Sequence, residues 1–309
     1  MVKYDVVIIG AGPGGLTAAV YALRSGLSVA IVEKGMIGGQ ASLTAEIKNF
    51  PGFINISGMD LAMKMHEQAT ELGAETIYGE VTNVNFAPMN NLIVVDGEQE
   101  VFANTVILSM GARARTLGVP GEEKFIGRGI CYCAVCDGAI FKDKEVVLVG
   151  GGNSAVEDAV YLSNICKKVT VINNLPKFTC QDGVLKEFEA QQADKQNIFV
   201  NQNSCVLEII GDKQVEAVKY LNDDGKEVTV KVDGVFIAIG RAPDTKVVRN
   251  SIHLDEHGYI ATNEQLETNQ PGVFACGDVR VKELRQIVTA CADGAIAATN
   301  ANSYITNND

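Results

Sequence analysis

The feature that most constrains the fold is an apolar run that leads into a glycine-rich turn. Residues 6–9 (VVII) have the continuous apolar character of a strand buried on both faces, and residues 10–15 (GAGPGG) follow at once. In this pattern the first glycine permits a tight turn, the second lets a pyrophosphate approach the backbone, and the last lets the next helix pack against the strand. The sequence therefore predicts a strand, a phosphate-binding turn and a helix over residues 16–25.

An acidic residue stands where this kind of unit binds a ribose. A second apolar run, residues 29–32 (VAIV), ends at Glu33, which lies 23 residues after Gly10. Dinucleotide-binding folds place a carboxylate about 20 residues after the turn, where it bonds the ribose hydroxyls. The order of strand, glycines, helix, strand and acid favours a dinucleotide site over a glycine turn with only a structural role.

The same pattern returns 140 residues later. Residues 145–149 (EVVLV) lead into residues 150–155 (GGGNSA), a helical stretch through Leu162 and a closing strand over residues 168–172. The next segment, residues 173–179 (NNLPKFT), contains neither an acid for a ribose diol nor an arginine for a 2′-phosphate. This second unit either binds a nucleotide or keeps the fold with the nucleotide lost or weakened.

Together these patterns predict an α/β protein with two Rossmann-like nucleotide-binding domains. Hairpin-like segments at residues 81–101 and 215–232 place a small antiparallel insert in each domain, which makes each of them a three-layer ββα unit. Near the end, residues 271–278 (PGVFACGD) predict a short strand. Residues 286–304 predict a helix rich in small residues that closes back onto the first domain.

Composition disfavours several classes of protein. A chain of 309 residues with 47% hydrophobic residues fits about two folded domains. The net charge of −12 disfavours nucleic acid and anionic lipid as partners. No apolar run reaches the roughly 18 residues of a membrane helix, and Asp5 interrupts what would be a signal-peptide core. We therefore expect a cytoplasmic protein without a membrane partner.

Three of the eight cysteines crowd into residues 131–136 (CYCAVC). The spacing of Cys133 and Cys136 suits a disulfide across one turn, so this pair is predicted to be redox-active. The alternatives are inert thiols or half of a zinc site, which would need a second Cys or His pair. Asp137 is either a proton carrier for the pair or a plain turn acid. No metal site is expected.

Motifs along essentially the whole chain resemble those of the low-molecular-weight, FAD-containing thioredoxin reductases. The matching segments are residues 10–15 (GAGPGG), 38–40 (GGQ), 49–52 (NFPG), 133–138 (CAVCDG), 240–243 (GRAP), and 277–278 (GD) followed by Arg285 and Gln286. The resemblance implies an FAD-binding domain of residues 1–112 and 246–309. It also implies an inserted NAD(P)H-binding-like domain, residues 117–242, that carries the cysteine pair.

The resemblance also implies roles for individual residues. FAD would be held at its pyrophosphate by the first glycine turn, at the adenosine ribose by Glu33 and at the ribityl chain by Asp278. The full set of implied FAD-binding residues is Gly10, Gly12, Pro13, Gly14, Gly15, Glu33, Lys34, Gly39, Gln40, Asn49, Gly277, Asp278, Arg285, Gln286 and Ile287. Cys136 would face the flavin, Cys133 would attack the disulfide of thioredoxin, and Asp137 would be the acid/base. The family is homodimeric.

One segment departs from the resemblance. NADPH-dependent members carry a His-Arg-Arg cluster and a further arginine at the positions that hold Asn173, Asn174, Leu175 and Thr179 here. Losing two charge-assisted bonds of about 1.5 to 3 kcal/mol each weakens NADPH binding by roughly two to four decades. The ferredoxin-dependent flavin thioredoxin reductases show the same loss, and this sequence is expected to lie closest to that subset.

The leading hypothesis is therefore an enzyme that takes electrons from reduced ferredoxin and passes them through FAD and the cysteine pair to thioredoxin. The alternative draws hydride from NADPH or NADH, and a flavin-binding redox sensor without turnover is less favoured. Ferredoxins are usually acidic, as is this chain, so docking requires a local basic patch. The candidates are Lys142 with Lys144, or Arg280, Lys282 and Arg285, unless these charges form only a solvated face.

Overall fold

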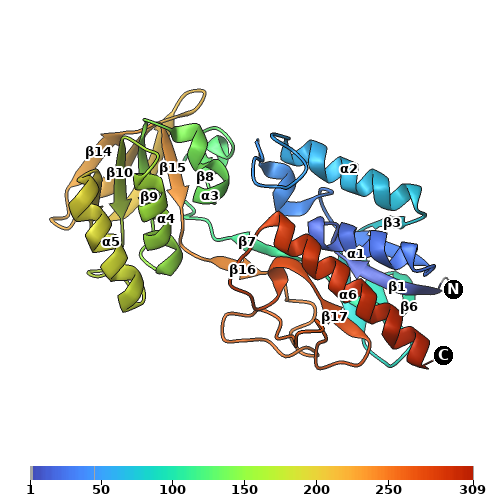
Figure 1. The fold of residues 1–309 in the computed structure, drawn as a ribbon. Helices are drawn as coiled ribbons and strands as arrows, with labels where there is room; N and C mark the ends of the chain where they lie inside the picture. The colour runs from blue at the N-terminus through green and yellow to red at the C-terminus, as the bar shows by residue number, and fades with distance from the viewer. Residues whose placement is uncertain (1–2, 45, 309) are drawn as a thin grey trace. The chain divides into compact units, whose positions relative to one another are not determined.

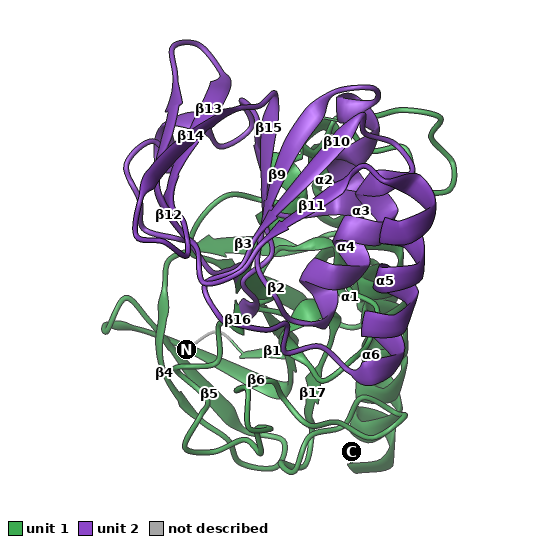
Figure 2. Cartoon of the chain, turned by 90° about the vertical axis from the view of Figure 1, so that its left-hand side faces the viewer, with its two compact units in different colours: residues 1–113, 242–309 green, residues 114–241 purple. Residues whose placement is uncertain are grey.

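The structure of the chain is a computed structural model that describes residues 3–44 and 46–308. The chain divides into two compact units, coloured separately in Figure 2. Unit 1 takes the described residues up to Arg113 and from Ala242 onward, and unit 2 takes Ala114–Arg241. The chain therefore passes between the units twice, and the two passages pair with each other as β7 (Ala112–Ala114) and β16 (Arg241–Pro243).

The main sheet of unit 1 is largely parallel. Its strand order is β3-β2-β1-β6-β5-β4, and β17 also pairs with β6. Strand β5 runs antiparallel to its neighbours β4 and β6, whereas the other strands of the sheet run parallel to β1. The strands are β1 (Lys3–Ile9), β2 (Val29–Glu33), β3 (Glu75–Tyr78), β4 (Val81–Asn85), β5 (Asn91–Val95), β6 (Gln99–Leu108) and β17 (Val273–Ala275).

The second part of β1, residues 6–9, is apolar because both faces of the sheet are covered there. Val6 and Ile8 belong to a core that the sheet shares with helices on one face, whereas Val7 and Ile9 belong to a second core on the other face. Figure 1 shows the N-terminal and C-terminal helices side by side against the sheet. The helices of unit 1 are α1 (Pro13–Arg24), α2 (Gly58–Glu71) and α6 (Ile287–Asn308).

The first predicted hairpin forms the antiparallel part of the main sheet, where β5 pairs with β4 and with the start of β6. Strand β6 is long enough to pair with β5 through its first half and with β1 through the rest. Asp96 and Gly97 turn the chain between β5 and β6 with φ values of 52° and 78°. The sequence predicted the turn, but the length of β6 makes it part of the same sheet.

Unit 2 has the three layers that were predicted. A parallel sheet in the order β11-β10-β9-β15-β8 carries helices on one face and a separate antiparallel sheet, β12-β13-β14, on the other. Along β9, Val146 and Leu148 face the helices, whereas Val147 and Val149 face the second sheet. The strands are β8 (Ile130–Cys131), β9 (Glu145–Val149), β10 (Lys168–Ile172), β11 (Ile198–Asn201), β12 (Cys205–Gly211), β13 (Val215–Leu221), β14 (Glu227–Lys231) and β15 (Gly234–Ile237).

Short helices complete both units. In unit 2, α3 (Ala134–Asp137) follows β8, while α4 (Asn153–Ser163) and α5 (Asp182–Lys195) form the helical layer. The remaining 3₁₀ turns are η1 (Gly39–Leu43), η2 (Glu123–Phe125), η3 (Gly138–Phe141) and η4 (Gly277–Val279). Within the described ranges, no helix combines the length and the hydropathy of a membrane span.

Candidate functional site

The first glycine turn forms an open cradle between β1 and α1. Gly10 has φ +104°, and a side chain there would overlap the backbone oxygen of Ser109. Helix α1 begins at Pro13, and Gly12 before it has no side chain to cap the first-turn amides. A Cβ atom on Gly12 would meet nothing within 4 Å, so the turn faces open space. Uncapped amides beside open space suit a phosphate group.

Glu33 is held beside this turn by backbone amides. One carboxylate oxygen accepts from Ala11 N at 2.7 Å, and the other accepts from Gly35 N at 2.7 Å. Each oxygen of a carboxylate has a second lone pair, so both can still accept from a ribose hydroxyl. The end of β2 therefore presents a fixed acceptor pair next to the phosphate cradle.

The segment after β2 reaches the same turn. Gly38 N donates to Ala11 O at 2.8 Å, and a Cβ on Gly39 would lie 3.7 Å from the Cα atom of Gly12. Gln40 is exposed in η1 beside them. Lys34 is engaged elsewhere, because its ammonium group bonds Asp244 at 2.8 Å and Glu80 at 3.2 Å.

The C-terminal part of unit 1 closes the cradle from the other side. A Cβ on Gly14 would lie 3.3 Å from the Cys276 sulfur and 3.1 Å from Ala290 O, so η4 and α6 lie against the first turn of α1. Gly277 N donates to Asp293 of α6 at 3.0 Å, and Asp278 follows in η4 with one carboxylate oxygen buried. Gly277 and Asp278 therefore lie next to α6, the predicted C-terminal helix.

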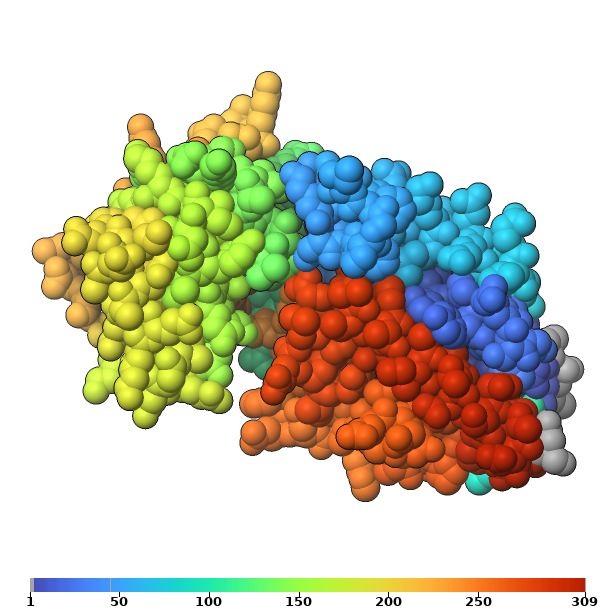
Figure 3. All heavy atoms as spheres, in the orientation of Figure 1, coloured from blue at the N-terminus to red at the C-terminus, as the bar shows by residue number. Residues whose placement is uncertain are grey.

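The residues before α6 add polar groups to this edge. Asn49 Nδ2 donates to Gln286 Oε1 at 3.0 Å, and Figure 3 shows the blue segment around residue 50 against the red start of α6. The Arg285 guanidinium lies 4.2 Å from the ring centre of Tyr259. Its Nε is buried and has no hydrogen-bond partner among the described residues. Ile287 is the first residue of α6.

These groups fit a flavin dinucleotide. The glycine cradle, Glu33, Gly39 and the start of α6 come together beyond the carboxyl ends of β1, β2, β6 and β17, where parallel sheets of this kind bind nucleotides. The buried, unsatisfied Nε of Arg285 is a donor in need of an acceptor. Ser109 and Cys276 line the same edge and were not predicted, although each directly follows an apolar strand.

A disulfide joins Cys133 and Cys136 in unit 2. Cys133 precedes α3 as its N-cap, its sulfur accepts from Cys136 N at 3.2 Å, and the two Cα atoms are 5.3 Å apart. In the part of the chain that the structure describes, no cluster of three or more His, Cys, Asp or Glu residues is placed to hold a metal. The disulfide itself makes thiol–disulfide exchange available at this turn.

Asp137 closes α3 beside the disulfide. Burial raises the pKa of Asp137 to about 6, and its hydrogen bond with the thiol of Cys131 opposes that rise. Burial, and then the neighbouring Asp137 carboxylate, raise the pKa of Cys131 far above its usual range. A carboxyl group that titrates near neutral pH is suited to moving protons to and from a sulfur pair.

The second glycine turn has the same geometry as the first. Gly152 precedes α4 and leaves its first-turn amides without a side-chain cap. Asn173 is buried, and its Nδ2 donates to Leu175 O at 3.2 Å, Lys177 O at 3.1 Å and Gln202 Oε1 at 2.6 Å. The Asn173 side chain therefore holds its own loop, and the exposed Lys177 is the only cation of residues 173–179.

One of the two basic patches predicted for docking does not exist as a solvated face. Arg280 bonds Asp293 at 2.9 Å and Lys282 bonds it at 2.7 Å, with side-chain exposures of 19% and 8%. Arg285 packs on Tyr259. Arg280 and Lys282 serve the interior of unit 1, because burial of Asp293 requires positive partners. Lys142 and Lys144 are exposed in unit 2.

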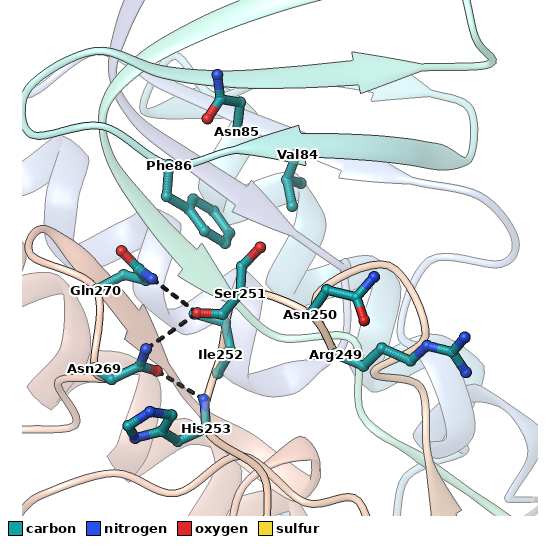
Figure 4. Close-up of a pocket in the computed structure, with 10 residues that line it drawn as sticks. All are labelled: Val84, Asn85, Phe86, Arg249, Asn250, Ser251, Ile252, His253, Asn269 and Gln270. Carbon is teal, nitrogen blue, oxygen red and sulfur yellow. Dashed lines mark hydrogen bonds between the residues drawn. The ribbon is translucent and has the colours of Figure 1, made fainter.

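A cavity of about 500 Å³ lies elsewhere in unit 1 (Figure 4). Polar groups dominate its wall, where Asn269 and Gln270 both donate to Ser251 O and Asn269 accepts from His253 N. No predicted site residue lines it. The cavity therefore does not form part of the nucleotide or disulfide site.

Comparison with known proteins places this chain and its fold in one class. Thioredoxin reductase of Listeria innocua is 46% identical over 98% of this chain and 94% of its own length. The crystal structure of thioredoxin reductase from Streptococcus pyogenes is 43% identical over 99% of both chains, with a TM-score of 0.91. The family described as pyridine nucleotide-disulphide oxidoreductase matches residues 4–294, and the chain belongs to this family.

The expectation that the chain lies closest to the ferredoxin-dependent subset is not supported. The ferredoxin-flavin thioredoxin reductase of Clostridium acetobutylicum is 29% identical over 99% of both chains, with a TM-score of 0.53. Both values are well below those for the Streptococcus pyogenes structure. The absence of arginines is confined to one loop, residues 173–179. Over the whole chain, the sequence is more similar to the Streptococcus pyogenes protein than to the ferredoxin-dependent one.

Proposed function

We propose that this protein is an FAD-dependent reductase that reduces the disulfide of thioredoxin through Cys133 and Cys136. The observation that carries the proposal is the disulfide at the N-terminus of α3 with Asp137 beside it, on a turn with no metal cluster among the described residues. The relatives described as thioredoxin reductases support it, because the similarity extends over 98% of this chain. A redox sensor without turnover has no separate observation in its favour.

FAD is assigned to unit 1 on the fit of its residues. The first-turn amides of α1 bind the pyrophosphate, Glu33 accepts from the adenosine ribose, and Asp278 faces the ribityl chain in this proposal. The flavin-ring end of FAD is assigned to Arg285 and to Gln286, which accepts a hydrogen bond from Asn49. Bound FAD supplies two-electron transfer to a disulfide.

The reduced form of the Cys133–Cys136 pair reduces thioredoxin by thiol–disulfide exchange. Cys133 loses a proton and attacks the thioredoxin disulfide, whose S–S bond breaks as a mixed disulfide forms. Cys136 then loses its proton and attacks Cys133, which re-forms the disulfide of the reductase. Two electrons and two protons have moved to the thioredoxin dithiol. Asp137 receives and returns these protons in turn, since its pKa of about 6 permits both states near neutral pH.

We propose a nicotinamide nucleotide, NADPH or NADH, as the electron donor at residues 150–155. The intact glycine turn and the uncapped start of α4 support this site. The alternative donor, ferredoxin, loses support because Arg280 and Lys282 are bonded to Asp293 inside unit 1. With Asn173 turned inward and no arginine after it, we expect little preference for NADPH over NADH.

Anaerobic mixing of the flavin-loaded protein with each donor tests this assignment. NADPH and NADH are expected to bleach the flavin absorbance rapidly and to support steady-state thioredoxin reduction. Bleaching by reduced ferredoxin alone would reject the nucleotide donor while leaving thioredoxin reduction intact. Failure of every donor to support thioredoxin turnover would reject the enzyme itself.

A cytoplasmic homodimer is also proposed, and the resemblance to the family is what supports it. Sedimentation equilibrium of the flavin-loaded protein is expected to give the mass of two chains. A mass of one chain at all concentrations would reject the dimer.

A further inference from the structure

The redox turn, residues 133–137, follows the last strand of the parallel sheet of unit 2. That strand, β8, pairs with β15 through Ile130 and Cys131, and Tyr132 is the one residue between the strand and Cys133. A strand of two residues makes few ladder hydrogen bonds. The position of the redox turn therefore depends on side-chain contacts beyond the strand.

The two sides of the redox turn pack into the two cores of unit 2. Ala134 is buried in the core on the helical face of the sheet, and a Cβ on Gly138 would lie 3.1 Å from the Tyr161 ring of α4. Figure 2 shows α3 beside α4. Tyr132 instead packs against the core on the other face of the sheet. Helix α4 thus supports the turn after Cys133, whereas Tyr132 supports the backbone before it.

Tyr132 is anchored by a buried carboxylate. Its hydroxyl donates to Glu122 Oε1 at 2.9 Å, and Glu122 is 2% exposed. Leu117 N donates to the same oxygen at 3.1 Å, and Gly118 N donates to Oε2 at 2.8 Å. All three groups are donors, which suits a carboxylate because it only accepts. Burial, and then the bond to Glu122, raise the pKa of Tyr132 above its usual range, so the hydroxyl keeps its proton.

Glu122 is itself held in place by the loop that carries it. Its backbone N donates to Val119 O at 3.2 Å, and Pro120 O accepts from Ile209 N of β12 at 3.0 Å. A Cβ on Gly121 would overlap the backbone oxygen of Ile209, so this loop lies directly against β12. The carboxylate is therefore a fixed point of the unit rather than a mobile surface group.

Resting on the proposed function, we infer that Glu122, through its hydrogen bond with Tyr132, positions the redox turn for disulfide exchange. Both are positioning residues, since they act through the backbone next to Cys133. In the oxidised protein the disulfide itself constrains the turn. In the dithiol form that cross-link is gone, and the anchor at Tyr132 keeps Cys133 close to Cys136. The anchor thereby raises the effective concentration of one thiol toward the other.

The step of the exchange that needs this constraint is the second one. The Cys136 thiolate attacks Cys133 of the mixed disulfide, the bond from Cys133 to the thioredoxin sulfur breaks, and that sulfur leaves with the electron pair and takes up a proton. A loosened turn slows this attack, because the two sulfurs of the reductase spend less time in line. The mixed disulfide is then expected to accumulate.

Three variants separate the anchor from simple packing. Tyr132→Phe removes the hydroxyl and keeps the ring, and Glu122→Gln keeps one acceptor oxygen but replaces the other with a donor group. Tyr220→Phe is the matched control, because Tyr220 lies in the same core at 6% exposure and its hydroxyl bonds Asn201 at 3.4 Å. Thermal unfolding verifies that each variant is folded. If Glu122→Gln does not fold, Tyr132→Phe decides the test.

The first measurement is the equilibrium of the flavin-loaded protein with glutathione. Two glutathione thiols give two electrons and two protons to the Cys133–Cys136 disulfide, which yields the dithiol and glutathione disulfide. The equilibrium constant of this reduction is expected to rise about tenfold in Tyr132→Phe and in Glu122→Gln, because the disulfide becomes harder to close. It should keep the wild-type value in Tyr220→Phe. A wild-type constant in Tyr132→Phe, or an equal rise in Tyr220→Phe, overturns the inference.

The second measurement follows one turnover of pre-reduced protein with thioredoxin by acid quenching and mass spectrometry. The mixed disulfide should persist longer in Tyr132→Phe than in wild type or Tyr220→Phe, and equal lifetimes in all three count against the inference. If wild type does not reduce thioredoxin but the glutathione equilibrium still shifts in Tyr132→Phe, the proposed function fails while the anchor stands. If thioredoxin is reduced and the equilibrium does not shift, the anchor fails while the proposed function stands.

Discussion

Single residues in this protein take their chemistry from their surroundings. Cys133 and Cys136 form the disulfide, whereas burial raises the pKa of Cys131, Cys166 and Cys276 and keeps these thiols protonated. The same residue type thus provides both the reacting pair and inert core thiols.

The two disulfide cysteines are expected to fail in different ways when replaced. Cys133→Ser should leave the flavin reducible by the donor but abolish thioredoxin turnover, since the attacking sulfur is lost. Cys136→Ser should disconnect the flavin from the thiols. Anaerobic absorbance and steady-state thioredoxin reduction measure both effects, with the exposed Cys205→Ser as the control. Normal turnover in either active-site variant would refute the assigned roles.

Asp293 is expected to make stability depend on pH. Burial disfavours its charge, but bonds to Arg280 and Lys282 prevail and hold the pKa of Asp293 below its usual range. Its contribution is therefore present above the unfolded pKa of about 3.9 and is lost as pH falls through the folded pKa. Asp293→Asn should cost about 3 to 5 kcal/mol at pH 7, because two buried cations lose their charged partner.

Urea unfolding at pH 7 and below pH 4 measures this difference, which should shrink at the lower pH. The exposed Asp224→Asn is the control and should change stability by less than about 0.5 kcal/mol. Equal losses at both pH values would show that the ion cluster does not act through its charge.

At the scale of elements, both units use the same device: a buried parallel strand, a glycine turn and a helix whose first amides are uncapped. In unit 1 the turn faces open space and an acceptor pair on Glu33. In unit 2 the loop after β10 is held by Asn173. Both units share this strand–turn–helix arrangement, and the loops after β2 and β10 decide which ligand each one fits.

Gly12→Ala is expected to weaken FAD binding by at least tenfold without unfolding the protein. The added methyl group meets no protein atom within 4 Å, so it fills the space assigned to the pyrophosphate. Reconstitution titrations followed by flavin fluorescence measure the affinity. Gly183→Ala at the start of α5 also enters open space and should bind FAD normally; equal affinity in both variants would contradict the cradle.

At the scale of the whole molecule, the two units differ in how the chain builds them. Unit 2 is one continuous segment, and both of its cores are made of its own residues. Unit 1 needs both ends of the chain, because α6 packs on α1 and β17 pairs with β6.

The segment 114–241 alone is therefore expected to fold with its disulfide and to bind no FAD. Circular dichroism should show one cooperative thermal transition, and the purified fragment should be colourless. The N-terminal segment of unit 1, residues 1–113, should lack cooperative unfolding when it is made alone, since it is without α6 and β17. A disordered 114–241 fragment would contradict the independence of the two cores.

Local patterns in the sequence determined the two Rossmann-like units, the positions of β2, β9 and β10, and the cysteine pair with its neighbouring acid. These features depend on residues close together in the chain, where apolar periodicity and glycine positions act directly. Only the tertiary structure decided that Arg280 and Lys282 turn inward to Asp293 and that Lys34 bonds Asp244. A side chain's partner is chosen by which elements pack together. Asp244 lies 210 residues from Lys34 in the sequence, and Asp293 reaches Arg280 and Lys282 because α6 packs against η4.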